Sequence, residues 1–387
     1  MDIEVESSDV GAEGRAAPGK RQRSPPADEA SSQKTRRARR DSGTHMIFSQ
    51  YEVVRTILGH LPREDVRSAA QVCSTWNSVA KIVLQSRMKA EWVLASTYPA
   101  LETFLRTQLA GDPRLCLVFL MKMKKSLVAC LRKHVGPACA VVEVQGSGIV
   151  GSPAGSLEAR ELEGRGRKGG ISALLLPSVP GVACRTFKIP GHVLAQVDEV
   201  DLTPEEVRAR TSIDPTDDVK CLLLFSDCCS AYMKRLALSV RRRQANEFVL
   251  AGGLCSMSCR TIAGVALAGP NVVAASMLLP SDVMKTSAAE KYFQEFRRDT
   301  KDIDAKQTVG LMFACVGRGK SMYNEPNVEA SLFRKYFPST PLVGFFGFGE
   351  IGADFVPDGR EARSVTDEYY DEYFRDYCTV FVYLAFT

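Results

Sequence analysis

Three short helical patterns follow one another between Phe48 and Trp92, in a stretch too small to bury a comfortable core by itself. The apolar residues of the first pattern share one helical face, at Val53, Val54, Ile57, Leu58 and Leu61. The Leu61-Pro62 pair ends this helix, because proline disfavours helical geometry in the residue before it. Val66 and Trp76 lie in the second and third patterns. We therefore expect a three-helix module with surplus apolar surface, which is typical of a unit that needs a partner.

The spacing of the apolar and proline residues in this module resembles the F-box family. The residues that match the family's motif are Ile57, Leu58, Leu61, Pro62, Val66, Val72, Cys73 and Trp76. The resemblance implies that the module binds the Skp adaptor subunit and, through it, a cullin-RING ubiquitin ligase, and that these residues form the interface or the packing beneath it. One departure is that the family usually opens its first helix with Leu-Pro, where this chain has Phe48-Ser49. The alternative is a helical cap on the next domain, since apolar helical stripes also form ordinary cores.

Residues 1–44 form a basic tail rich in Ser, Pro and Ala, and this composition predicts disorder. Its positive charges fall in two clusters, Lys20, Arg21 and Arg23, then Lys34, Arg36, Arg37, Arg39 and Arg40. Such a pair of clusters is typical of a bipartite nuclear import signal, which predicts a protein of nucleus and cytoplasm. The alternative is a solvated tail with loose affinity for acidic surfaces or nucleic acid, and we expect no nucleic-acid binding beyond such non-specific contacts.

The chain shows no secretory signal and no apolar run long enough to span a bilayer, so we expect an intracellular protein with no membrane contact. Most of the twelve cysteines fall within apolar runs, which predicts reduced core residues. The cysteines and the four histidines do not group into the four-ligand sets of structural zinc. We therefore expect neither a metal nor a cofactor.

Beyond the module, the sequence predicts an α+β architecture. Residues 93–112 favour a helical connector, and residues 113–387 contain about eleven short strand patterns with helices between some of them. We expect one mixed α/β domain there, in one or two lobes, after a tail over residues 1–44 and a module over residues 45–92. The Gly- and charge-rich stretch 145–170 favours an exposed loop. No internal repeat at a fixed period is evident, which argues against a propeller or a leucine-rich solenoid.

Two Gly-rich segments mark the C-terminal part of this domain. Residues 310–319 read GLMFACVGRG and residues 341–352 read PLVGFFGFGEIG, with a helical pattern between them. Together with Ala-Gly-Gly at 251–253, these segments resemble the C-terminal half of the FIST domain family. Members of that family in signalling proteins are regarded as small-ligand sensors, so the resemblance implies a binding domain.

The residues that we single out as a candidate ligand or substrate site are Cys315, Gly317, Arg318, Gly319 and Glu350. The glycines would let backbone amides approach a ligand, and Arg318 would offer a forked donor to a carboxylate or phosphate. In the alternative, which we favour, the glycines serve tight turns and Arg318 forms an ion pair with Glu350.

Cys315 lies three residues before Arg318, where a cation and free amides would lower its pKa and make it nucleophilic. The adjacent pair Cys228-Cys229 raises the same question. The alternative, again favoured, is an inert small hydrophobe at the end of a buried strand.

We find no catalytic motif, whether a Gly-x-Ser-x-Gly elbow or a phosphate-binding loop, and therefore expect a non-catalytic protein. The leading hypothesis is a substrate receptor of a Skp–cullin–F-box (SCF) ubiquitin ligase, which recruits proteins for ubiquitination and proteasomal degradation through its FIST-like domain. The alternative is an amino-acid-like small-molecule sensor, or a FIST-derived enzyme, whose helical module is only structural. The sequence does not identify the protein substrates.

Overall fold

The computed structural model describes residues 50–122, 125–164, 169–194, 202–228, 231–244, 246–256, 261–357 and 373–387. The chain divides into two compact units, Met1–Val54 and Arg55–Thr387. The basic tail and Phe48-Ser49 lie outside the described residues.

The helical module consists of helical residues 50–60 followed by α2 (Arg63–Ala69) and α3 (Ser74–Ser86). The first helix ends just before Pro62, as its sequence predicts, and Pro62 occupies the N-cap position of α2. Arg87, directly after α3, donates hydrogen bonds to the carbonyls of Leu58 (3.1 Å) and Leu61 (2.8 Å). A cation at a helix C-terminus satisfies carbonyls that lack helical partners, so Arg87 fixes the end of the first helix against α3.

The remainder of the chain repeats one order of elements three times. A first strand is followed by a helix, a central strand, a second helix, a third strand parallel to the central one, and a last strand between the first and the central strands. The first repeat comprises β1 (Glu91–Ala95), α4 (Tyr98–Thr107), β2 (Pro113–Met121), α5 (Lys125–Val135), β3 (Ala140–Gly146), β4 (Gly148–Gly151), β5 (Arg160–Leu162) and β6 (Gly170–Pro177).

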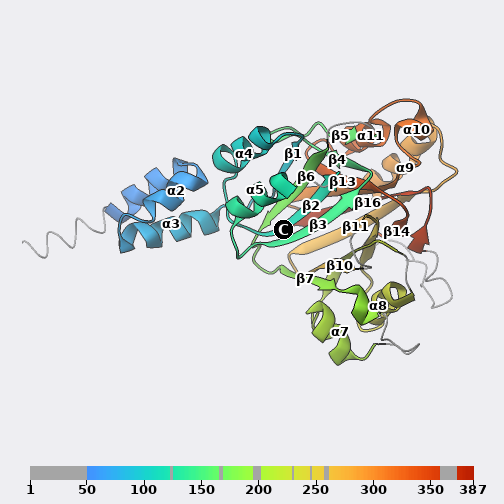
Figure 1. The fold of residues 1–387 in the computed structure, drawn as a ribbon, viewed down its shortest axis with the longest axis horizontal. Coiled ribbons are helices and arrows are strands. Elements are labelled where there is room, and N and C mark those ends of the chain that lie inside the picture. The colour runs from blue at the N-terminus through green and yellow to red at the C-terminus, as the bar shows by residue number, and fades with distance from the viewer. Residues whose placement is uncertain are drawn as a thin grey trace, which may run out of the picture. The chain divides into compact units, whose positions relative to one another are not determined.

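The second and third repeats follow the same plan. The second comprises β7 (Ala183–Ile189), α6 (Gly191–Leu194), α7 (Pro204–Thr211), β8 (Val219–Ser226), α8 (Ala231–Arg241), β9 (Val249–Leu254) and β10 (Ile262–Ala268). The third comprises β11 (Val272–Leu279), α9 (Thr286–Asp299), β12 (Gln307–Cys315), α10 (Lys320–Tyr323), α11 (Val328–Tyr336), β13 (Leu342–Gly347), β14 (Glu350–Gly352), β15 (Phe374–Arg375) and β16 (Thr379–Phe386). Figure 1 shows these elements in chain order by colour.

Each repeat builds one sheet, and segments from other repeats extend two of the three. The sheet orders are β1-β6-β2-β3, β15-β14-β9-β8-β10-β7 and β11-β16-β12-β13-β4-β5. Strand β4 of the first repeat thus pairs with β13 of the third, and β14 of the third repeat pairs with β9 of the second. We call the segment that leaves a repeat after its third strand the arm of that repeat.

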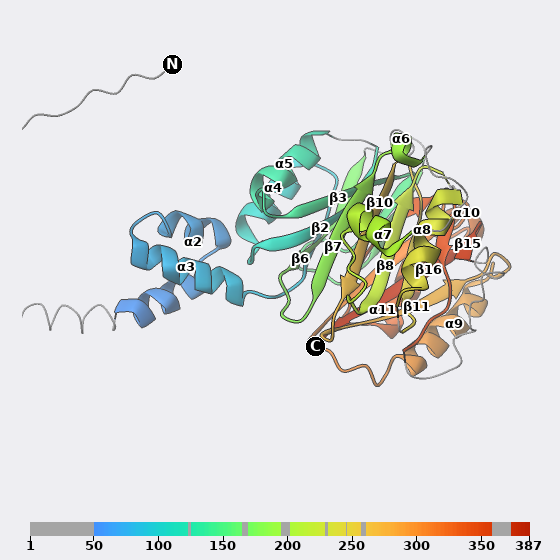
Figure 2. The same ribbon diagram turned by 90° about the horizontal axis from the view of Figure 1, so that it is seen from below.

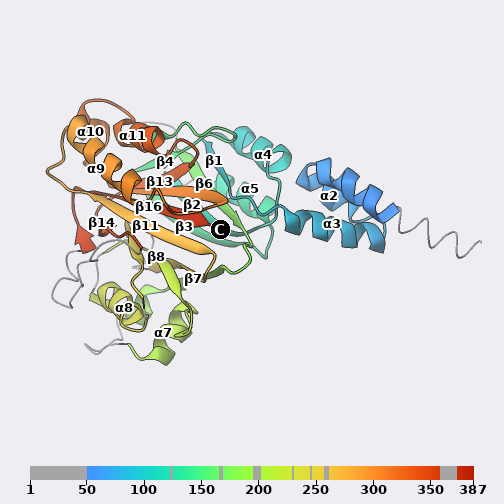
Figure 3. The same ribbon diagram turned by 180° about the vertical axis from the view of Figure 1, so that it is seen from behind.

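The three sheets enclose a common apolar core. At its centre lie Phe119, Phe225 and Phe313 from the three central strands, with ring centroids 5.6 to 6.1 Å apart, and Phe345 stacks on Phe119 at 5.5 Å. We call these four side chains the aromatic centre. On the outside, helices α4 and α5, α7 and α8, and α9 and α11 cover the three sheets, each pair over its own apolar cluster. Figures 2 and 3 show the helix pairs around the strands.

The α+β fold class is confirmed, but three expectations within it are corrected. The described residues form sixteen strands rather than about eleven, and these strands share one apolar core. Residues 93–112, expected to be a helical connector, contain most of β1 as well as α4, and both belong to the first repeat.

The stretch 145–170 is the third correction, because it is not a simple exposed loop. It contains β4, whose four residues are all buried, and β5. Its glycines reflect close packing: a Cβ on Gly151 would lie 2.5 Å from the Ser172 hydroxyl, and one on Gly148 would lie 2.7 Å from the Leu162 carbonyl oxygen. Glycine therefore marks here a strand squeezed between neighbours.

Candidate functional site

The residues that match the F-box motif separate into a core and a surface. Leu58 and Val66 are fully buried, at 0% exposure, so they hold the module together. Ile57 and Val72 are large apolar residues that remain 51% and 65% exposed. Pro62 and Cys73 are also exposed, while Leu61 and Trp76 are half-buried. The apolar stripe predicted for the first helix thus splits between neighbouring residues, and only one side of it forms core.

Burial of exposed Ile and Val side chains by a partner is favourable, and exposed apolar residues that lie together mark interaction sites. We define Ile57, Leu61, Pro62, Val72, Cys73 and Trp76 as the candidate docking surface. Leu58 and Val66 act beneath it, through packing alone.

A polar network fixes α2 to the first repeat. The fully buried Arg63 donates from Nε to Asp112 at 2.6 Å and from one terminal nitrogen to the His134 carbonyl at 2.9 Å. Arg67, one turn later, donates to the same carboxylate at 3.0 Å and the same carbonyl at 3.2 Å. Two guanidinium groups that converge on one carboxylate and one helix end hold the module in a defined orientation to that repeat. No sequence motif points to this network.

In the FIST-like part, the structure gives Arg318 a different role from either one predicted. Its side chain is fully buried, and Nε donates to Glu329 at 2.7 Å. The terminal nitrogens donate to four oxygens of the protein, namely the carbonyls of Pro280, Val283 and Tyr377 and the Tyr323 hydroxyl. All five N–H donors of the guanidinium are therefore used. The prediction of an Arg318–Glu350 pair is wrong, and the proposed anion-binding fork has no donor left for a ligand.

The acid that the sequence reasoning missed is Glu329, which is fully buried in the first turn of α11. Besides Arg318, it accepts hydrogen bonds from the Tyr323 hydroxyl at 2.9 Å and the Thr379 hydroxyl at 2.7 Å. Only the acidic residue near a helix start hints at it in the sequence, and many solvent-exposed glutamates share that position. The group Arg318, Glu329, Tyr323 and Thr379 joins β12, α10, α11 and β16 into one rigid corner.

The two glycines beside Arg318 are explained by neighbours within the chain. A Cβ on Gly317 would lie 2.9 Å from the ring of Tyr377. Gly319 has a φ of +64°, and a Cβ there would lie 2.5 Å from the Glu163 carboxylate, which accepts the Lys320 N–H at 3.0 Å. Close packing therefore requires both glycines without any ligand.

Cys315 and Glu350 lie in the same corner but are not arranged for chemistry. Cys315 is only 6% exposed, and burial, with Glu350 as a second cause, raises the pKa of its thiol above the usual value. Burial also raises the pKa of Glu350 to about 8, and its Oε2 accepts the Cys378 N–H at 3.1 Å. A raised thiol pKa opposes thiolate formation, so the geometry does not support a reactive Cys315. Cys228 is half-buried, and Cys229 lies outside the described residues.

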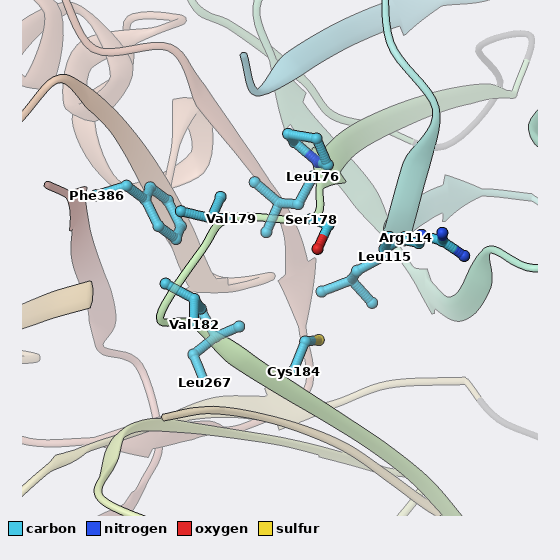
Figure 4. Close-up of a pocket in the computed structure, with 10 residues that line it drawn as sticks. Arg114, Leu115, Leu176, Ser178, Val179, Val182, Cys184, Leu267 and Phe386 are labelled. Carbon is cyan, nitrogen blue, oxygen red and sulfur yellow. The ribbon is translucent and has the colours of Figure 1, made fainter. Parts of the chain in front are cut away.

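A pocket of about 290 Å³ opens between the first and second repeats (Figure 4). Its lining residues are Arg114, Leu115, Leu176, Pro177, Ser178, Val179, Val182, Cys184, Leu267 and Phe386. It lies at the opposite end of the central strands from Cys315 and shares no residue with the predicted site. The lining is mostly apolar, as in many binding pockets.

Within the described ranges, no group of three or more His, Cys, Asp or Glu side chains is arranged to hold a metal ion. No helix among those residues is long and apolar enough to cross a membrane. The eight basic residues of the predicted import signal lie outside the described residues.

Comparison with known families agrees with both motif resemblances. Residues 51–84 match the F-box domain, and residues 239–353 match the FIST C domain. The first match covers the docking surface, and the second covers Phe313 and Phe345 of the aromatic centre and Arg318, Tyr323 and Glu329 of the corner. The chain thus contains one region similar to an F-box domain and one region similar to a FIST C domain.

Two curated proteins resemble the chain over most of its length. F-box only protein 22 of Homo sapiens is 28% identical over 388 residues, which cover 87% of this chain and 93% of that protein. The Pongo abelii protein of the same name matches over the same shares. An uncharacterized protein of Mycobacterium tuberculosis is 32% identical over 82 residues, 21% of each chain. The resemblance that the sequence motifs indicated is confirmed.

Among solved structures, a cyanuric acid hydrolase from A. caulinodans aligns with this chain at a TM-score of 0.35 and 11% identity. The alignment covers 77% of this chain and 99% of the hydrolase chain.

Proposed function

We propose that this chain is the substrate-receptor subunit of an SCF ubiquitin ligase. The docking surface binds the Skp adaptor and through it the cullin, while the three-repeat domain binds the protein to be ubiquitinated and sent to the proteasome. The observation that carries the proposal is the exposure of Ile57 and Val72 above a core of Leu58 and Val66. A purely structural helical cap would bury such residues, whereas a docking module presents them.

The joint between module and receptor supports the same role. A receptor must hold its substrate at a fixed distance from the subunit that transfers ubiquitin, and Arg63 and Arg67 give the module a fixed orientation on the first repeat. Ubiquitin transfer itself would belong to other subunits. The alternative of a small-anion sensor at Arg318 gains no support, since all donors of that side chain bind the protein itself.

Co-purification from cells tests the proposal. The wild-type chain should retain Skp adaptor and cullin, and a variant with Ile57→Asp and Val72→Asp should lose both while it remains folded. Met284, 60% exposed in the third repeat, offers a matched control, because Met284→Asp places a charge on an equally exposed apolar residue away from the module. If the double variant retains the adaptor as well as the control does, the receptor role fails at its first step.

We also propose that the basic clusters of the tail direct part of the protein to the nucleus, with the rest in the cytoplasm. The support is their spacing alone, with Lys20, Arg21 and Arg23 separated from Lys34 by ten residues. A fluorescent reporter fused to residues 1–44 should enter the nucleus, and Ala at the eight basic positions should keep it in the cytoplasm. Equal distribution of both reporters would refute the proposal.

A further inference from the structure

The threefold order of elements makes it possible to compare equivalent positions between repeats. Leu117, Leu223 and Leu311 each lie two residues before a Phe of the aromatic centre. Each leucine pairs with a residue of the last strand of its repeat, and that residue pairs in turn with one on the first strand. The residues reached in this way on the three first strands are Trp92, Thr186 and Ser276. These three residues occupy the same place on the inner face of their sheets.

In the first and third repeats, the repeat's own arm covers this place. The Trp92 indole N–H donates to the carbonyl of Ser156 in the first arm at 2.8 Å. The Ser276 N–H donates to the carbonyl of Phe355 in the third arm at 2.8 Å, and the Ser276 hydroxyl donates to the Ala353 carbonyl at 2.7 Å. Both arms run as extended strands before they reach these contacts, as β4 and β14.

The second repeat begins an arm in the same way. The Ser256 N–H donates to the Gln145 carbonyl of β3 at 2.7 Å. The arms of the other two repeats begin with equivalent bonds, from the Ser147 N–H to the Phe346 carbonyl of β13 and from the Phe348 N–H to the Leu254 carbonyl of β9. Only residues 257–261 then separate Ser256 from β10, whereas residues 148–169 and 349–378 fill the corresponding gaps. Among the backbone hydrogen bonds of the described residues, none joins an arm residue to Thr186.

The exposure of the inner face follows this difference. In the third repeat Ala274, Ser276 and Leu278 are all buried. The equivalent residues of β7 are Cys184 and Lys188, both exposed, and Thr186, half-buried. The outer face of the same strand is ordinary core, with Phe187 and Ile189 buried under the helices. The first strand of the second repeat thus exposes its inner face to solvent. It has Lys188 at the position where the other two repeats have Leu94 and Leu278.

The edge of β3 is open in the same region. The third strands of the other two repeats carry an antiparallel partner on this edge, β14 on β9 and β4 on β13. On β3 the Gln145 carbonyl faces the open edge and accepts a hydrogen bond from the Ser256 N–H. Alternate residues of a strand direct their backbone groups to the same edge, so those of Val141 and Glu143 also face it. Among the described residues neither has a strand partner there. An unpaired strand edge is a template for another strand.

We propose that an extended segment of a partner protein fills the place of the missing arm, adding antiparallel to β3 and lying over the inner face of β7. This inference rests on the proposed receptor function, since it names the surface that holds the protein to be ubiquitinated. The two internal arms show that this fold binds an extended strand in the equivalent places. Strand addition of this kind supplies affinity through main-chain hydrogen bonds and selectivity through alternate side chains.

The groove also specifies the chemistry of the segment. A segment that adds antiparallel to β3 begins near Val144 and ends near Ala140. By strand register, Val144 and Lys188 lie at the height of the aromatic centre, and Ala140 and Cys184 lie at the other end of the groove. Lys188 is exposed and has no acidic partner among the described residues, so it favours a carboxylate at the start of the segment. The apolar pocket next to Cys184 lies at the other end, where Leu115, Val182 and Leu267 surround open space in Figure 4. We expect an acidic residue followed, about four residues later, by a large apolar one.

Selection of peptides on the full-length protein tests this, because no partner sequence is needed in advance. A random linear dodecapeptide library is panned on the wild-type chain without the adaptor, and the affinities of selected peptides are measured by fluorescence anisotropy. Three variants probe the groove. Val141→Pro removes an edge N–H, a change that edge strands tolerate; Thr186→Trp fills the groove with the side chain of the first repeat; and Lys188→Glu reverses its charge. Lys301→Glu, at an exposed lysine of the third repeat, is the matched control.

Selected peptides should carry the acidic and apolar pair. Their affinity should fall at least about tenfold on Val141→Pro and on Thr186→Trp, and the preference for the acid should disappear on Lys188→Glu. Unchanged affinity on the groove variants, or no selected peptide that distinguishes Val141→Pro from wild type, would overturn the proposal. So would concentration-dependent dimers that Val141→Pro dissolves, since a second copy would then be the occupant. Adaptor binding by the same variants should match wild type, which separates a failure of the groove from a failure of the receptor role.

Discussion

Replacing Arg318 with Met would show whether this corner of the FIST-type domain is structural or binds a ligand. The substitution keeps the apolar stem and removes the guanidinium, leaving the buried Glu329 without its ion-pair partner and three backbone carbonyls without a donor. Breaking a buried ion pair from one side costs roughly 3–5 kcal/mol. We therefore expect the free energy of unfolding to fall by about 4 kcal/mol, measured by urea denaturation of the full chain.

Two further variants make this measurement decisive. Glu329→Gln alone should also destabilise, and the double variant should cost clearly less than the sum of the two, because each single change strands the other partner. Arg298→Met is the matched control, since Arg298 is 53% exposed and an exposed ion pair contributes at most about 1 kcal/mol. A loss below about 1 kcal/mol for Arg318→Met would refute the structural role and return Arg318 to the candidates for ligand binding.

Further predictions concern other buried groups. Burial, with Glu329 as a second cause, raises the pKa of Glu161 to about 8, so the stability that Glu161 contributes is present at low pH and is lost as the pH rises from about 4.5 to 8. In thermal unfolding, Glu161→Gln should therefore stabilise the chain more at about pH 8 than at about pH 5. An equal effect at the two pH values would contradict this. Leu58→Ala should unfold the module at a cost of about 2–5 kcal/mol, read by proteolysis, and a resistant variant would show that Leu58 is not core. Cys315 should react with iodoacetamide more slowly than the exposed Cys73 in peptide mapping, and faster labelling would show a reactive thiol.

The sequence predicts the local elements well because their signals are local. Helix α7 (Pro204–Thr211) begins at such a local signal, since Pro at its first position and a capping threonine before it act within one turn. Leu61-Pro62 likewise marks the end of the first helix. The module and the Gly-rich segments carry family spacing, which is why the F-box and FIST resemblances are found from single motifs.

What the sequence does not show is the arrangement that depends on distant contacts. The threefold order has no sequence periodicity, because its equivalent positions tolerate different residues: the place opposite the central Phe is Phe345 in one repeat, Val144 in another and Gly253 in the third. Gly253 suits this position because the Phe345 ring would lie 3.3 Å from a Cβ there. The Phe345 side chain of the third repeat thus occupies the space that a side chain at position 253 of the second repeat would fill.

The candidate site shows the same limit. Arg318 stands out in the sequence between two glycines, but a local pattern cannot tell whether its partner lies at 329 or 350, since both positions reach the corner only in the fold. Ile57 and Leu58 are neighbours on one predicted stripe, yet one is exposed and the other buried, so only part of that stripe forms core. Burial of this kind is decided by tertiary packing.

The affinity of the full-length chain for purified Skp adaptor tests the central claim most directly. Ile57 and Val72 are about half exposed, so complete burial on docking would gain about 1 kcal/mol from each. Ile57→Ala with Val72→Ala should therefore weaken binding by roughly 30-fold, with the unfolding temperature unchanged. Binding as tight as wild type in this double variant, or no binding by the wild-type chain, would contradict the account.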